Sequence, residues 1–409
     1  MIPFSPPRVD KKTTDAVTAV LLSGWITSGP KTKEFESKLA DYSGNPTTLC
    51  LNSATAGLEL VLRWFGVGPG DEVILPAYTY CATANVVMHC GAKPVLVDVN
   101  ANDFNISVKN IEAAITSKTK VIMPVDFAGL PCDYDEINNL VKKSSIVSLF
   151  KASSEEQKQL GRILVLSDSA HSFGAQYYGT KAGTLTDVSV FSFHAVKNLT
   201  TAEGGAIALN FPAPFDNKAI YEQLRVWSLH GQNKDALSKT KAGAWEYDVV
   251  NAGYKCNMTD IQAAVGLVEL ERYDSENLPR RKTIFDAYSA ELSKHSWAEL
   301  SPYLNDTKVS SFHLFPLRIK GATLEQRNSI IEEISKNEVA VNVHFKPLPL
   351  LTFYKNEGYK MDDYPVAYDN FKREISLPVY YGLSDDNVKT VLSVVIAAVE
   401  KVMGQWRDD

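Results

Sequence analysis

One lysine stands between two apolar runs of the chain, where a buried amine could do covalent chemistry. Residues 188–193 are rich in β-branched and aromatic side chains, a pattern typical of a buried strand. Lys197 follows in a polar turn, and residues 206–209 are again apolar. Burial between strands would lower the lysine pKa, and a neutral amine can form a Schiff base with a carbonyl group. A solvated lysine in a surface loop fits this stretch equally well.

A carboxylate ends a second apolar run. Residues 163–166 have the pattern of a buried strand, and Asp168 follows directly after Ser167. Ligands of open parallel sheets bind beyond the carboxyl ends of the strands, which would put Asp168 at a ligand site. There its carboxylate could pair with a protonated pyridine nitrogen, the role that an aspartate plays in pyridoxal phosphate enzymes. The alternative is an aspartate that caps the following turn.

Small residues open a predicted helix at residues 52–57, Asn-Ser-Ala-Thr-Ala-Gly. The free N–H groups and the dipole of a helix start attract phosphate, and Ser53 and Thr55 could add hydroxyl groups. An ordinary Ser/Thr N-cap would leave the same pattern. Tyr80 follows the predicted strand 72–75 and offers a ring on which a flat cofactor could stack, although a core tyrosine is the alternative.

Three more polar side chains lie near these positions in the sequence. Ser192 ends the predicted strand before Lys197 and could donate its hydroxyl to the same phosphate. His171 and His194 could donate hydrogen bonds to the groups that hold the cofactor, although a single histidine is more often a structural residue. The combination is more specific than its parts, because a phosphate cradle, a stacking aromatic, a carboxylate and a lysine each follow a predicted strand. No Gly-x-Ser-x-Gly, His-Glu-x-x-His or P-loop motif competes with them.

Composition narrows the class of protein. The 409 residues are 45% hydrophobic and carry a formal net charge of −6, which favours neither nucleic acid nor an anionic membrane as a partner. The N-terminus lacks a signal-peptide pattern, and no apolar stretch reaches the ~20 residues of a membrane span. We therefore expect a cytoplasmic protein without a metal centre. Its cysteines form no Cys-x-x-Cys pair and are expected as buried free thiols; they are Cys50, Cys81, Cys90, Cys132 and Cys256.

Alternating strand and helix patterns predict an α/β protein with a largely parallel sheet covered on both faces. The expected strands are 48–52, 72–75, 94–99, 121–125, 163–166, 188–193 and 206–209. The expected helices are 13–22, 33–42, 58–65, 82–88, 108–115, 134–141, 217–226, 259–273 and 277–295. A proline-rich arm precedes them at residues 1–10, a polar insertion that we expect on the surface interrupts them at 144–161, and residues 235–244 are expected as an exposed loop.

A smaller C-terminal α/β domain is expected after a boundary near residue 275, which gives domains 1–275 and 276–409. Its predicted elements are strand 312–319, helix 324–336, strand 339–345, strand 374–378 and helix 385–403. Capping boxes are predicted at Thr259 with Gln262 and at Thr323 with Gln326, and Ser384 is expected to cap the last helix.

Several motifs resemble the nucleotide-sugar aminotransferases of the DegT/DnrJ/EryC1/StrS family. They include Asn-Ser-Ala-Thr-Ala-Gly at 52–57, Ser-Asp-Ser-Ala-His at 167–171, Ser-Phe-His-Ala-Val-Lys-Asn at 192–198 and Ala-Glu-Gly-Gly at 202–205. Ile-Pro-Phe at 2–4, Gly-Trp-Ile-Thr-Ser-Gly-Pro at 24–30, Gly-Tyr-Lys-Cys-Asn at 253–257 and Val-His-Phe-Lys-Pro at 343–347 also fit. The match spans almost the whole chain.

The resemblance implies an aspartate-aminotransferase-like (fold type I) protein with pyridoxal 5′-phosphate as cofactor, in a homodimer with shared active sites. Lys197 would hold the cofactor as a Schiff base, and Asp168 would pair with its ring nitrogen. The other implied cofactor contacts are Ala54, Thr55 and Ser192 at the phosphate, Tyr80 against the ring, His171 near the ring hydroxyl, and Asn257 from the other subunit. Candidate substrate contacts are Thr27, Arg225, Lys255, His344 and Lys346.

The resemblance also implies the reaction. L-Glutamate would give its amino group to a nucleotide-linked ketosugar for polysaccharide or lipopolysaccharide synthesis, because relatives that act as dehydratases carry histidine where this chain has Lys197. The motifs look most like the branch that acts at C4 of UDP-linked sugars, which includes the enzymes of 4-amino-4-deoxy-L-arabinose and pseudaminic acid synthesis. A C3 acceptor, a sugar dehydratase and a non-catalytic regulator on the same fold are the alternatives.

Overall fold

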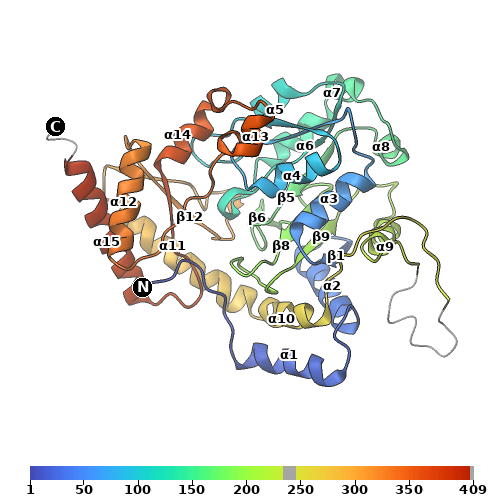
Figure 1. Ribbon diagram of the computed structural model, residues 1–409, viewed down its shortest axis with the longest axis horizontal. Helices are drawn as coiled ribbons and strands as arrows, with labels where there is room; N and C mark the ends of the chain where they lie inside the picture. Colours follow the sequence, from blue (N-terminus) through green and yellow to red (C-terminus); the bar gives the residue numbers. More distant parts are fainter. Residues whose placement is uncertain (234–245, 406–409) are drawn as a thin grey trace.

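A seven-stranded mixed sheet forms the centre of the computed structural model, which describes residues 1–233 and 246–405 (Figure 1). The strand order is β1-β9-β8-β5-β4-β2-β3. Strand β9 runs antiparallel to both of its neighbours, and all other pairs are parallel. The strands are β1 (Thr47–Leu51), β2 (Glu72–Pro76), β3 (Lys93–Val97), β4 (Thr119–Ile122), β5 (Leu164–Asp168), β8 (Val188–Ser192) and β9 (Gly205–Leu209). The prediction of a mostly parallel α/β sheet is confirmed, and the predicted loop 235–244 lies outside the described residues.

Both faces of this sheet are buried, as the continuous apolar runs predict. Leu164 and Leu166 of β5 pack into one hydrophobic cluster, whereas Val165 between them packs into another. Successive side chains of a strand point to opposite faces, so each face has its own core. The helices that follow these strands are α3 (Ala54–Trp64), α4 (Cys81–His89), α5 (Val108–Ala114), α6 (Tyr134–Lys142) and α9 (Asn217–Trp227).

Two helices that precede the sheet in the chain pack against one helix that follows it. Helices α1 (Lys11–Ser23) and α2 (Pro30–Ser43) both contact α10 (Asp260–Glu271). The predicted capping box of α10 is present, because Thr259 and Gln262 each bond the backbone of the other. A short π-helical turn, Tyr273–Asn277, then leads into α11 (Leu278–Leu292).

The C-terminal part has a small antiparallel sheet in the order β10-β12-β13. Its elements are β10 (Ala298–Leu300), β12 (Phe315–Ile319), α12 (Leu324–Lys336), α14 (Pro365–Arg373), β13 (Glu374–Leu377) and α15 (Asp385–Gln405). One hydrophobic cluster joins α11, α12, α15 and this sheet, and Figure 1 shows α11, α12 and α15 side by side. The predicted capping box at Thr323 and the Ser384 cap are both present.

The predicted strand 339–345 is wrong. Only single bridges form there, from Val339 to Ile2 and from Asn342 to Ser376. Side chains form hydrogen bonds with the backbone groups that a longer strand pairing would need. The N–H of His344 donates to the Glu374 carboxylate at 3.0 Å, and its carbonyl accepts from the Tyr78 hydroxyl at 2.6 Å.

The predicted insertion folds into two short helices, α7 (Ser144–Leu149) and α8 (Glu155–Leu160). It is not purely a surface feature, because Gln157 is fully buried and donates to the carbonyl of Phe65 at 2.9 Å. The remaining elements are β6 (Gln176–Tyr177), β7 (Thr180–Lys181), β11 (Lys308–Val309) and α13 (Thr352–Asn356). All five cysteines are free, and within the described residues no helix is both long and apolar enough to span a bilayer.

Candidate active site

A cavity of about 500 Å³ lies at the carboxyl ends of the central strands. Residues far apart in the sequence meet there because β5 and β8 are parallel neighbours and end at the same edge of the sheet. The predicted residues that line the cavity are Ala54, Thr55, Tyr80, Asp168, His171, Ser192, Lys197 and His344.

Lys197 lies in the turn between β8 and β9, and its N–H bonds the carbonyl of His194 at 2.9 Å. Solvent still reaches the side chain through the cavity, but protein surrounds the amine. Burial lowers the pKa of Lys197 to about 8, because the charged ammonium loses hydration, and the nearby Asp168 carboxylate opposes this shift. A substantial fraction of the amine is therefore neutral near physiological pH.

Asp168 ends β5 and is almost fully buried. Its carboxylate accepts from the Thr83 hydroxyl at 2.8 Å and from the Ala170 N–H at 3.3 Å. Burial raises the pKa of Asp168, while these two donors and the Lys197 charge pull it back. A cation placed against this carboxylate would find a fixed, poorly hydrated partner.

Helix α3 begins at the cavity wall. The Ser53 hydroxyl caps it by accepting from the Ala56 N–H at 3.1 Å, which leaves the N–H groups of Ala54 and Thr55 without acceptors inside the helix. Gly205 of β9 lets this helix start approach the sheet, because a Cβ there would lie 2.3 Å from the Ala54 nitrogen. The arrangement is a ready anion site.

The imidazole ring of His171 lies on the cavity wall with one nitrogen unsatisfied by the described part of the chain. It is buried, and its Nδ1 has no hydrogen-bond partner among the described residues. The ring lies 4.4 Å from the ring of His313 and 5.8 Å from that of Phe345, centroid to centroid. Burial, and then the Lys197 charge, hold its pKa well below the usual range, so the ring is neutral.

These groups together fit pyridoxal phosphate. The α3 start suits a phosphate, the buried Asp168 suits a protonated ring nitrogen, and Lys197 suits a Schiff base. The unsatisfied His171 Nδ1 fits a polar substituent of the ring, because a buried nitrogen without a partner is costly. Ser192 and Tyr80 line the same cavity, and the Tyr80 ring is 60% exposed and therefore open to a ligand.

Other predicted residues do not line the cavity of their own chain. Thr27 precedes α2, with its carbonyl bound to the Asp260 N–H at 3.1 Å. Lys255 donates to the Asn257 side chain at 2.6 Å, and that amide donates to the Ser28 hydroxyl at 2.6 Å. Two more stay apart from the cavity: Arg225 pairs with Glu222 on α9, and Lys346 is exposed beyond the cavity wall. Their roles stay predictions.

Several cavity residues were missed in the sequence. Phe4 and Ser5 of the N-terminal arm line the cavity, and so do His313 and Phe345. Thr83 was also missed, although it lies three residues after Tyr80 at the start of α4, the spacing of one helical turn. The Ile-Pro-Phe motif of the arm fits the family, but only the folded chain brings Phe4 and Ser5 to the site.

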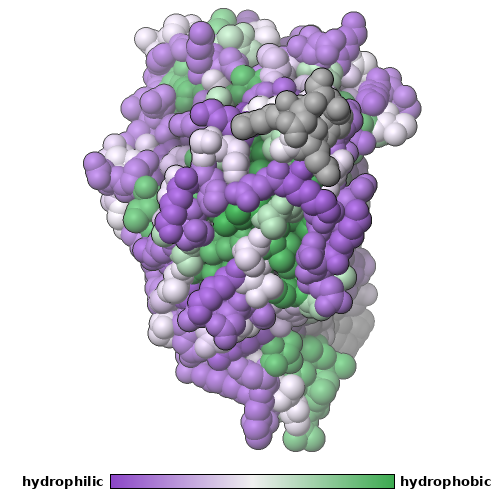
Figure 2. All heavy atoms as spheres, turned by 90° about the vertical axis from the view of Figure 1, so that its left-hand side faces the viewer, coloured by the Kyte–Doolittle hydropathy of each residue, from purple (hydrophilic) through white to green (hydrophobic). Residues whose placement is uncertain are grey.

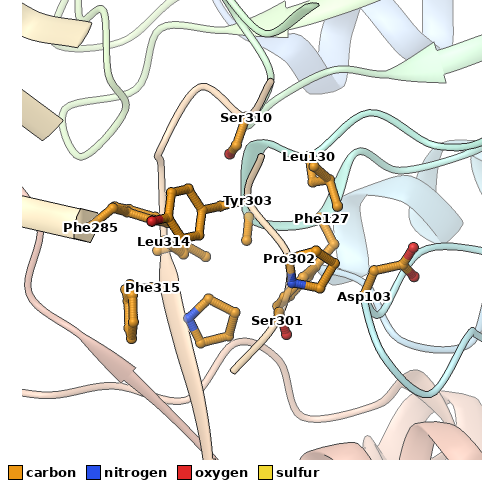
Figure 3. A pocket seen from close by; sticks show the side chains of 12 residues that line it. Asp103, Phe127, Leu130, Phe285, Ser301, Pro302, Tyr303, Ser310, Leu314 and Phe315 are labelled. Carbon is orange, nitrogen blue, oxygen red and sulfur yellow. The ribbon is translucent and has the colours of Figure 1, made fainter. Parts of the chain in front are cut away.

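A second, small cavity of about 20 Å³ shares the lining residue Leu314 with this site (Figure 3). Phe127 and Leu130 line one side, and Tyr303 and Phe315 line another. The Ser301 hydroxyl is buried there and has no hydrogen-bond partner in the described part of the chain. Its size suits one water molecule and excludes any substrate.

Comparison with known proteins supports the assignment of the cavity to pyridoxal phosphate. The sequence model of the DegT/DnrJ/EryC1/StrS aminotransferase family matches residues 7–396. The chain belongs to this family. It is a pyridoxal-phosphate-dependent transaminase, as the motifs predict.

Three relatives cover nearly the whole aminotransferase. The structure of Spr1654 from Streptococcus pneumoniae, a protein assigned as a sugar aminotransferase, is 50% identical, with a TM-score of 0.95 over 98% of this chain and 100% of that one. It is known in forms with pyridoxal phosphate and pyridoxamine phosphate. SpsC of Bacillus subtilis, a spore coat polysaccharide biosynthesis protein, is 35% identical over 96% of both chains. PseC of Helicobacter pylori, an aminotransferase of pseudaminic acid biosynthesis, is 28% identical, with a TM-score of 0.85 over 98% and 100%.

Proposed function

We propose that this aminotransferase moves the amino group of L-glutamate to the C4 keto group of a UDP-linked sugar, for synthesis of a cell-surface polysaccharide or lipopolysaccharide. The observation that carries the proposal is the single cavity that gathers Lys197, Asp168 and the start of α3. The sugar acceptor is supported by the names of SpsC and Spr1654. The C4 position is supported by the resemblance of the motifs to the branch that acts at C4 of UDP-linked sugars.

Each residue has a defined task in this proposal. Pyridoxal phosphate, when bound, supplies the electron sink for amino-group transfer. The α3 start and the Ser192 hydroxyl bind its phosphate, and Asp168 keeps its ring nitrogen protonated. Lys197, with a pKa near 8, takes a proton from the amino acid Cα and returns one at the next step.

We also propose a homodimer with shared active sites. Asn257 lies outside the cavity of its own chain, so a role at the phosphate requires that it reach the site of a second copy. Exposed apolar side chains support association, because Leu21, Leu22 and Ile26 are at least half exposed near the end of α1.

A panel of ketosugar nucleotides tests the substrate. Purified enzyme is incubated with L-glutamate and each sugar, and the position of the new amine is read by NMR. We expect amination at C4 of a UDP-linked sugar. Amination at C3 would move the assignment to the C3 branch, an amine-free deoxysugar would indicate a dehydratase, and a cofactor spectrum unchanged by glutamate would indicate a binding protein.

A further inference from the structure

His344 is held on the cavity wall by contacts from three directions. The Tyr78 hydroxyl donates to its carbonyl, and its own N–H donates to the Glu374 carboxylate. Phe4 of the N-terminal arm stacks on the imidazole, with ring centroids 5.5 Å apart and an interplanar angle of 24°. Two of these contacts fix the backbone at residue 344 and the third fixes the ring, which indicates that the orientation of the imidazole matters in the cavity.

A buried hydrogen-bonded chain runs from this ring into β13. Nδ1 of His344 lies 2.9 Å from the Ser376 hydroxyl, and that hydroxyl bonds the Oε1 of Glu374. Ser376 and Glu374 are fully buried, whereas His344 lines the cavity. Nε2 of His344 has no hydrogen-bond partner in residues 1–233 and 246–405, so it is the nitrogen available to a ligand.

The single proton of the Ser376 hydroxyl links the two ends of this chain. When Glu374 is ionised, Ser376 donates to it and accepts from Nδ1–H, which leaves a lone pair on Nε2. When Glu374 is protonated, it donates to Ser376, Ser376 donates to Nδ1, and Nε2 carries the hydrogen. A proton can therefore pass between the cavity and Glu374 while the imidazole stays neutral.

We propose that His344, Ser376 and Glu374 form a proton relay that serves the water taken up and released during transamination. The inference rests on the proposed function, in which one half-reaction consumes a water and the other releases one. Release of the keto acid turns a water oxygen into a carbonyl oxygen, and amination of the sugar turns a keto oxygen into water. The same relay takes a proton in the first event and gives it back in the second.

The proton balance closes over the two half-reactions. In the first, both O–H bonds of the water and the C–N bond break. The departing amine nitrogen takes one proton and the electron pair of the C–N bond, while the other proton forms Nε2–H, Nδ1–H passes to the Ser376 oxygen, and the Ser376 proton passes to Glu374. In the second, these transfers reverse: the keto oxygen takes one proton from the attacking amine and the other from Nε2–H, and it departs as water with the electron pair of the C–O bond. Glu374 alternates between carboxylate and carboxylic acid, and no other reactant is needed.

The pKa values of His344 and Glu374 suit the transfer of a proton from the cavity to Glu374. Burial, with a contribution from the Lys197 charge, lowers the pKa of His344 to about 3, which disfavours an imidazolium. Burial raises the pKa of Glu374 to about 8, while its hydrogen bonds and the nearby Arg327 charge oppose this rise by favouring the carboxylate. Between the two half-reactions the transferred proton is therefore held on Glu374 and not on the ring.

A single-turnover experiment with glutamate alone tests the relay without knowledge of the sugar. The holoenzyme is mixed with L-glutamate, and release of 2-oxoglutarate is timed. We expect Ser376→Ala and Glu374→Gln each to slow release by at least about 10-fold, since a lost acid–base group costs about 10²–10⁴-fold, with glutamate affinity nearly unchanged. Ser289→Ala, which removes a hydroxyl of α11 that does not line the cavity, is the matched control and should release product at the wild-type rate.

A second readout needs no substrate. In protein labelled with ¹⁵N-histidine, the His344 signals are identified by their loss in His344→Gln. We expect one tautomer in the wild type and a shifted Nδ1 signal in Ser376→Ala. Wild-type release rates in both relay variants, or an unchanged Nδ1 signal, would overturn the relay. A wild-type enzyme that converts glutamate but aminates no ketosugar would instead overturn the proposed acceptor and leave the relay standing.

Discussion

At the scale of single residues, the site depends on groups whose charge is set by burial. Lys197 and Asp168 lie in the same cavity, and two effects on their pKa values oppose each other. Burial disfavours the charged form of each group, whereas the attraction between the two charges favours both charged forms. Burial dominates for both groups, so the pKa of Lys197 is lowered and that of Asp168 is raised. A reactive neutral amine is therefore available close to a buried carboxyl group.

Replacement of the lysine tests its covalent role. We expect Lys197→Ala to lose the Schiff-base absorbance and to lower turnover by about 100-fold or more, since it removes both the anchor and the proton carrier. Absorption spectra after addition of pyridoxal phosphate and turnover with glutamate measure the two effects. An alanine variant with full turnover would show that the assignment of Lys197 is wrong.

The pKa of Lys197 predicts a pH dependence for cofactor uptake. Only the neutral amine reacts, so the rate at which apoprotein takes up pyridoxal phosphate should rise with pH through about 8, and not through the ordinary value of 10.5. Asp168→Asn removes the charge that opposes this shift, and its midpoint should move to lower pH. Stopped-flow absorbance at a series of pH values gives both midpoints, and a wild-type midpoint near 10.5 would contradict the prediction.

At the scale of elements, the site is made by strand ends and one helix start. The sequence predicts β8 and β5 to within two residues, because their apolar runs are continuous and bounded by polar turns. It fails at residues 339–345, where β-branched residues look like a strand but side chains take up the backbone groups. The domain boundary near residue 275 stays a prediction.

Close packing of β9 on the start of α3 gives an element-scale prediction. We expect Gly205→Ala to lower the free energy of unfolding by about 1–3 kcal/mol, the usual cost of overpacking, and to weaken cofactor binding, because its Cβ would displace the Ala54 backbone. Gly68→Ala is the matched control, since nothing lies within 4 Å of a Cβ there. Urea unfolding and cofactor titration measure the two effects, and equal behaviour of the variants would contradict the cradle.

At the scale of the whole molecule, the cavity is closed by parts that lie far apart along the chain. The N-terminal arm joins the C-terminal part through the Ile2–Val339 bridge, while Arg8 pairs with Glu276 at 2.6 Å. Figure 2 shows the side on which α12 and α15 lie, with apolar atoms gathered at its lower end, at the height of α1 in Figure 1. Leu22 of α1 is 83% exposed, which fits association with a second copy.

Mixing of two defective variants tests the shared site. If Asn257 serves the partner's cofactor, a mixed dimer of Lys197→Ala and Asn257→Asp chains has one site with both lesions and one intact site. Random re-association should then restore about a quarter of wild-type activity, because about half of the dimers are mixed and each has one working site. Activity that stays at the sum of the separate variants would contradict a shared site.

The α/β class, the family, the cofactor and the residues expected to hold it could all be predicted from the sequence, because strand patterns and strand-end motifs are local in the chain. Which of those residues share one cavity depends on the folded structure. It placed Phe4 against His344, joined His344 to Glu374 through Ser376, and kept Asn257 away from the cavity of its own chain. These relations depend on packing between segments that are distant in sequence, and no local pattern encodes them.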